Sequence, residues 1–136
     1  MTWLFKEEPS HYGFEQLERD GRTTWSGVKN PLAQKHLRGV KGGDRILYYH
    51  TGSEKAIVGT ASAAGDAYPD PDDSSGKSYV VDVVPGRRLA RPVTLAELKQ
   101  LAALADFALV RMPRLSVMPV TGEQLREIER LAGARA

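Results

Sequence analysis

The sequence RILYYHTGSEKAIVGTASAA, residues 45–64, contains two apolar runs separated by a short polar segment. Both runs are the length of strands and carry aromatic or β-branched side chains, so they predict strands at Arg45–His50 and Ala56–Ala64. Gly59 interrupts the second run, which indicates a bulge or a close approach by another group. Alternation along the first strand sends Tyr48 and His50 to one face and Tyr49 to the other.

Further strands are predicted on both sides of this segment. They are Trp3–Lys6, which Glu8-Pro9 ends, Tyr79–Val84, which Pro85-Gly86 closes, and the short piece Ser116–Val120. Thr23–Asn30 and Tyr68–Gly76 are interpreted as loops. Helical periodicity and N-cap signals predict helices at Phe14–Gly21, Pro31–Val40, Thr94–Leu101 and from Thr121 onward. Strands and helices do not alternate regularly, which favours an α+β fold with a small, mostly antiparallel β-barrel decorated by short helices.

Length and composition limit the class of protein. A chain of 136 residues is predicted to form one domain, residues 1–136, with a single hydrophobic core. Because cysteine is absent, disulfides, thiolate zinc sites and a cysteine nucleophile are excluded. Charge appears already at Lys6, before a signal-peptide core is complete, and no apolar run is long enough to span a membrane. We expect a cytoplasmic protein that acts as a monomer without a membrane partner.

The positive charge is concentrated in one segment. The net charge is only +2, but five cations face a single acid, Asp44, in residues 29–45; they are Lys29, Lys35, Arg38, Lys41 and Arg45. Such a stretch can contact a few phosphates, although an ordinary solvated helix face explains it equally well.

Signatures of catalysis and cofactor binding are missing. The sequence has no nucleophile elbow, phosphate-binding loop or dinucleotide motif. Its three histidines, His11, His36 and His50, are too scattered for a helical zinc site. We therefore expect neither a cofactor nor a metal, and no enzymatic activity.

Residues Trp25–Asn30 (WSGVKN) are the most unusual segment, because they contain one of two tryptophans and the only asparagine of the chain. An indole can stack on a nucleobase, an amide can donate to and accept from a base edge, and Gly27 allows close approach of the backbone. The alternative is structural: Trp25 lies in the core, Asn30 is the N-cap of the following helix and Gly27 makes a turn.

Taken together, several short motifs resemble the EVE domain family of PUA-like proteins. They are Lys6-x-Glu8-Pro9, Trp25-x-Gly-Val-x-Asn30, Tyr49-His50-Thr51 and Arg114-Leu-Ser-Val-x-Pro-Val120. The resemblance implies a five-stranded barrel with a pocket similar to the aromatic cage of the YTH readers. It also implies a ligand that is a flipped or unpaired modified base, above all a modified cytosine in DNA. This sequence departs from the family pattern at Ser26, where Asp is usual, and at Lys29, where Arg is usual.

Matching positions give the expected site. The ligand-binding residues carried over are Trp25, Gly27, Val28, Asn30, Lys6, His50 and Ser116. Trp25 is expected to be the stacking wall, Asn30 an edge reader and Val28 the contact for an added methyl group. The cations expected to meet phosphates are Lys29, Lys35, Arg38 and Arg114.

Three rival functions stay open at this point. The same surface can hold tRNA or rRNA, as in RNA-binding PUA modules. Lys6, Glu8 and His50 can form a general acid/base set for a small nucleotide or amide hydrolase if their side chains converge. A domain that binds only other proteins is the third alternative.

Overall fold

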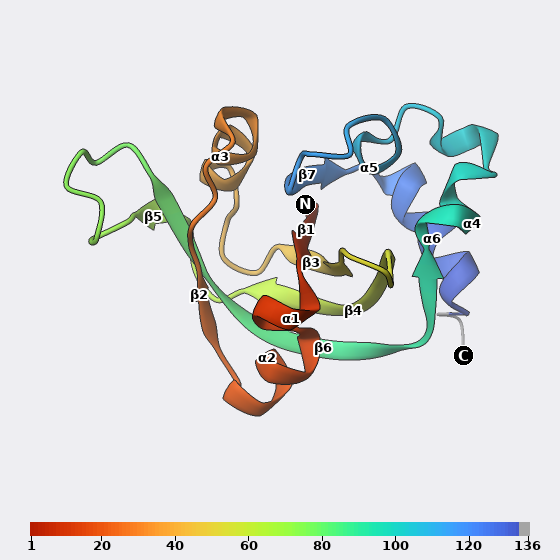
Figure 1. Ribbon diagram of the computed structural model, residues 1–136, viewed down its shortest axis with the longest axis horizontal. Coiled ribbons are helices and arrows are strands. Elements are labelled where there is room, and N and C mark those ends of the chain that lie inside the picture. Colours follow the sequence, from red (N-terminus) through yellow and green to blue (C-terminus); the bar gives the residue numbers. More distant parts are fainter. Residues whose placement is uncertain (134–136) are drawn as a thin grey trace.

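The computed structural model describes residues 1–133 and consists of a curled mixed sheet with short helices around it (Figure 1). The strands are β1 (Thr2–Glu7), β2 (Thr23–Trp25), β3 (Arg45–His50), β4 (Ala56–Ala63), β5 (Tyr68–Pro69), β6 (Tyr79–Thr94) and β7 (Val117–Val120). They follow the order β2-β6-β4-β3-β1-β7, with β5 paired to β6. Among the strands of the described residues, only β1 and β3 pair in parallel, from Thr2↔Arg45 to Glu7↔His50, so the expected α+β class and the mostly antiparallel sheet are confirmed.

The expected count of five strands is wrong, because the described residues form seven. Thr23–Trp25, interpreted as loop, pairs with Val81–Val83, and Tyr68–Pro69 pairs with Tyr79–Val80. The strand that begins at Tyr79 does not close at Pro85-Gly86 but continues to Thr94. Proline is tolerated there because the pairing between β4 and β6 shifts register around Gly59, next to the pair Ala61↔Pro85.

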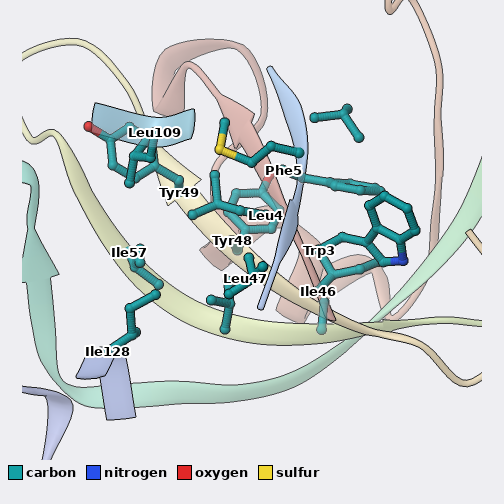
Figure 2. Packing of buried hydrophobic residues seen from close by; sticks show 14 of the residues in the cluster. Trp3, Leu4, Phe5, Ile46, Leu47, Tyr48, Tyr49, Ile57, Leu109 and Ile128 are labelled. Atoms are coloured by element: carbon teal, nitrogen blue, oxygen red, sulfur yellow. The ribbon is translucent and has the colours of Figure 1, made fainter. Parts of the chain in front are cut away.

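Gly59 lies where an aromatic ring approaches the sheet. A Cβ atom at this position would stand 2.5 Å from Cζ of Phe14, closer than any real contact allows. Of the two predicted explanations for Gly59, the close approach is therefore confirmed, and the register shifts on both sides of Gly59 agree with a bulge as well. Phe14 belongs to a buried cluster that includes Phe5 on β1 and Tyr48 on β3, and Figure 2 shows these two side by side in the core.

The helices of the described residues are short, and three of the six α-helices begin at a side-chain cap. They are α1 (Pro9–Tyr12), α2 (Phe14–Asp20), α3 (Pro31–Arg38), α4 (Leu95–Lys99), α5 (Ala108–Arg111) and α6 (Gly122–Ala132), with a 3-10 turn at Ala102–Leu104. The predicted N-caps are confirmed, since Asn30, Thr94 and Thr121 accept hydrogen bonds from the backbone N–H three residues later. α1 and α5 were not predicted, because four residues carry too little periodicity to reveal a helix.

The position of α3 matters most for the site. β2 and β7 are the two outer strands of the curled sheet. α3 follows β2 along the chain and packs against β7 and β6 (Figure 1). Its buried side consists of Ala33, Gln34 and Leu37. Lys35 and Arg38 are exposed, as the predicted amphipathic pattern requires.

Candidate functional site

The loop between β2 and α3 displays the asparagine on the surface. Gly27 has a φ of 76°, a conformation that favours glycine, and the chain then turns into α3 at Asn30. Asn30 Oδ1 accepts from the Ala33 N–H at 3.0 Å, so the amide oxygen already caps the helix. The Nδ2 group makes no hydrogen bond within residues 1–133, and it is the half of the amide that remains for a ligand.

Gln34 holds this loop in place, a role that the sequence did not reveal. Its side chain is buried, with 7% of the residue exposed. Nε2 donates to the carbonyls of Val28 at 2.7 Å and Tyr79 at 3.3 Å, and Oε1 accepts from the Tyr79 N–H at 2.9 Å. One carboxamide thus ties the β2–α3 loop to the first residue of β6, which lies 45 residues further along the chain.

A groove of about 370 Å³ opens beside Asn30. Leu32 belongs to the same side as Asn30, and the opposite wall is the segment Arg111–Leu115 between α5 and β7. Arg114 is exposed there, and its guanidinium has no hydrogen-bond or ion-pair partner within the described part of the chain. The groove therefore combines one amide donor, apolar walls and a cation, which are the groups that bind a flat, polar-edged ligand next to a phosphate.

Lys6 is hydrogen-bonded to the segment that forms one wall of the groove. Its Nζ donates to the Pro113 carbonyl at 2.7 Å, and its backbone N–H donates to the Ser116 carbonyl at 2.9 Å. Burial lowers the pKa of the Lys6 ammonium from its ordinary value. Lys6 and Ser116 thus lie next to the groove but do not line it, so direct contact of either with a ligand stays a prediction.

Trp25 lies in the core rather than in the groove. Only 6% of the residue is exposed, and its ring centroid stands 5.2 Å from that of Phe5 and 5.4 Å from that of Tyr48. These neighbours already cover much of the indole. A base can meet only the remaining edge unless the cluster rearranges, and the role of Trp25 as a stacking wall stays a prediction.

His50 lies at another cavity, of about 560 Å³, which α1, α2 and β6 border. The residue is 8% exposed, and its Nε2 accepts from the Phe14 N–H at 3.0 Å. Because a backbone N–H can only donate, the ring proton is on Nδ1, which donates to Glu54 Oε1 at 2.7 Å. His50 is fully bonded, and the structure does not bring it together with Asn30.

Lys6, Glu8 and His50 are each bonded to a different partner, and no hydrogen bond or ion pair within residues 1–133 links them to one another. Lys6 is bonded to the Pro113 carbonyl and His50 to Glu54, while the Glu8 carboxylate accepts from the Thr51 hydroxyl at 3.3 Å. Within residues 1–133 no three histidine or acidic side chains gather as a metal site would require. No helix of this described part is long and apolar enough to cross a membrane.

Of the four cations expected to meet phosphates, Arg114 lines the groove, while Lys29 belongs to the β2–α3 loop and Lys35 and Arg38 belong to α3. Lys29 and Lys35 are exposed and form no ion pair inside the range 1–133. Arg38 is partly engaged, since it donates to the Lys77 carbonyl at 2.9 Å and its guanidinium stands 5.3 Å from the Tyr79 ring centroid.

Comparison with known proteins agrees with this architecture. The family model described as EVE domain matches residues 1–131. Thymocyte nuclear protein 1 of Danio rerio is 31% identical, and the alignment covers 90% of this chain and 68% of that protein. Rpa0253 from Rhodopseudomonas palustris, solved by NMR, is 42% identical with a TM-score of 0.94, covering 99% of this chain and 94% of that one. Human THYN1 protein, in a crystal structure with 5-methylcytosine-containing DNA, is 28% identical with a TM-score of 0.86, covering 96% of both chains.

Proposed function

The chain belongs to the EVE domain family, and from that premise we propose that it is a non-catalytic module that binds a modified nucleobase, modified cytosine in DNA first of all. The observation that carries this proposal is the match along nearly the whole chain to human THYN1 protein, whose crystal structure contains 5-methylcytosine DNA. The groove beside Asn30 supports it, because its size and its mixture of amide, apolar and cationic groups suit one base with its flanking phosphates.

In the proposed complex the base leaves its stack and enters the groove between Asn30 and the Arg111–Leu115 wall. The Asn30 Nδ2 group donates to an acceptor on the base edge, while Leu32 and Leu115 contact the ring faces. Val28 packs against the hydrophobic core and does not line the groove, so its contact with the added methyl group stays a prediction. Lys29, Lys35 and Arg114 meet the neighbouring phosphates, so binding weakens as salt is raised.

The first test compares cytosine with 5-methylcytosine in DNA and RNA oligonucleotides of identical sequence, by fluorescence anisotropy. We expect tighter binding to the modified DNA. Equal affinity for modified and unmodified DNA refutes the proposal, and a preference for RNA whatever the modification favours the RNA-binding alternative.

Two variants separate the two roles of Asn30, as the N-cap of α3 and as the proposed hydrogen-bond donor to the base. Serine is as good an N-cap as asparagine but has no amide donor, so Asn30→Ser is expected to keep the melting temperature and lose the preference for the modified base. Asn30→Ala is expected to lose both. Thr121→Ala is the matched control, because it removes the N-cap of α6 and should lower stability by about 1 kcal/mol without changing binding.

Trp25 requires a mild substitution. Replacing a buried tryptophan by alanine costs about 3–5 kcal/mol of stability, so Trp25→Ala would confuse loss of fold with loss of a stacking partner. Trp3 is equally buried on β1 and provides the control. If Trp25 contacts the base, ligand quenches the tryptophan fluorescence of Trp3→Phe but not that of Trp25→Phe. Ligand binding without quenching in Trp3→Phe, where Trp25 is the remaining tryptophan, removes Trp25 from the site.

The non-catalytic part of the proposal rests on the separate partners of Lys6, Glu8 and His50. Incubation of the protein with a nucleotide panel, followed by chromatography, is expected to show no turnover. Turnover that Lys6→Met or His50→Ala abolishes, in protein that stays folded, contradicts this part.

A further inference from the structure

The tip of the segment between α5 and β7 carries an exposed apolar side chain. Met112 is 43% exposed and is one of three large hydrophobic residues classed as exposed in the described part of the chain. It lines the groove opposite Asn30, and Arg111 and Arg114 stand on either side of it along the chain. It is not among the residues packed against the hydrophobic core, so stability does not explain its presence.

The backbone around Met112 is firmly held. The Met112 N–H donates to the Ala108 carbonyl at 2.7 Å, and the Met112 carbonyl accepts from the Leu115 N–H at 3.0 Å. Pro113 has a restricted φ, and its carbonyl accepts from Lys6 Nζ at 2.7 Å. A side chain that is presented from such a backbone enters a partner without a large further loss of backbone entropy.

A base that leaves a duplex creates a gap in the stack, and unstacking costs a few kcal/mol. Proteins that deform DNA fill such gaps with an apolar wedge, for which methionine is one of the usual residues. Cations on both sides of the wedge can meet the phosphates that flank the gap. Met112 stands beside the groove proposed for the extruded base and has a cation on either side.

We propose that Met112 is a wedge that enters the base stack next to the extruded base, and that the substrate is therefore duplex rather than single-stranded DNA. This inference rests on the proposed function. It assigns the exposed tip of Met112 to the gap in the duplex, next to the groove whose wall Met112 also helps to form. A single strand has no paired stack to fill, so the wedge contributes nothing to binding it.

The test measures binding of wild type, Met112→Ala and Met112→Leu to single-stranded and duplex DNA, each with cytosine or 5-methylcytosine at one position. We expect Met112→Ala to bind the modified duplex about tenfold more weakly, equivalent to about 1.4 kcal/mol. Because Met112 also lines the groove, Met112→Ala should weaken binding of the modified single strand much less than that, and Met112→Leu, which keeps an apolar tip, should restore most of the loss. Tyr68→Ala removes an exposed apolar side chain that does not line the groove, and it should show no duplex-specific loss.

A second readout follows the stack itself. With 2-aminopurine placed beside the modified cytosine, wild type should raise its emission, and Met112→Ala should raise it less at equal occupancy. If wild type prefers the modified base but Met112→Ala weakens both forms of DNA equally, or neither, the wedge is refuted and the proposed function stands. If wild type shows no preference for the modified base in either form, the proposed function fails and the wedge with it.

Discussion

Removing the Gln34 carboxamide should destabilise the protein far more than its position on a short surface helix suggests. Gln34 makes three hydrogen bonds with Val28 and Tyr79, at 2.7, 3.3 and 2.9 Å, from a nearly buried site. Each such bond contributes about 0.5–1.5 kcal/mol, and the longest lies at the weak end, so Gln34→Ala should cost about 3 kcal/mol. At about 3–4 °C per kcal/mol for a chain of this size, the melting temperature should fall by about 10 °C.

Calorimetry or circular dichroism gives the melting temperature, with Gln100→Ala as the matched control. Gln100 is an exposed glutamine at the C-cap of α4 whose side chain makes no hydrogen bond within residues 1–133, so its replacement should change stability very little. Gln34→Glu keeps the size of the side chain but removes both donations, and it should destabilise the protein at least as much as Gln34→Ala. The reasoning is refuted if Gln34→Ala and Gln100→Ala melt together.

Three other substitutions test the fold and the charged surface. Gly59→Ala forces a Cβ atom to within 2.5 Å of the Phe14 ring and should cost about 1–3 kcal/mol, seen as a lower urea midpoint. Burial raises the pKa of Asp44, but hydrogen bonds, the first from the Trp3 indole, outweigh it and hold that pKa below its ordinary 3.8. The ionised carboxylate therefore stabilises the fold above pH ~4, and this stabilisation is lost as the pH falls through the lowered pKa of the folded state. Asp44→Asn should thus be less stable than wild type at pH 7, with the difference closing in acid. Lys35→Ala should lower the slope of log affinity against log salt by about 0.9 on duplex DNA; an unchanged slope removes Lys35 from the phosphate contacts.

Local signals explain which parts of the fold were predictable. The strand at Arg45–His50 matches its predicted bounds, and the caps at Asn30, Thr94 and Thr121 were identified correctly, because each depends on residues within one turn or one strand. β2 is different: three residues, Thr23–Trp25, form a strand only because β6 offers a partner almost 60 residues later. Such pairing leaves no periodic signal in a three-residue segment.

The same distinction applies to the site. The asparagine, the glycine turn and the cations were recognisable from residue type and spacing, and the structure brings Asn30 and Arg114 to one groove. Gln34 was missed because its partner Tyr79 is remote in sequence. Residue type alone also does not say whether a tryptophan packs inward or outward, and Trp25 packs inward.

The cap at Asn30 has a consequence for recognition that residue type alone does not give. An asparagine in a flexible loop can rotate and present either its oxygen or its nitrogen to a ligand. Here the oxygen is fixed on the Ala33 N–H at 3.0 Å, so the amide plane is set by the helix and the Nδ2 group points away from the cap. The Asn30 side chain therefore offers a donor and not an acceptor, and it can donate without further ordering of the side chain. A base is favoured when an acceptor lies at the edge that enters the groove, and a base whose corresponding edge carries only a donor is excluded. If a modified cytosine enters the groove as proposed, Asn30 would bond to the ring N3 or the carbonyl oxygen rather than to the exocyclic amine. The added methyl group, on the far side of the ring from the carbonyl, would then be left for apolar contact.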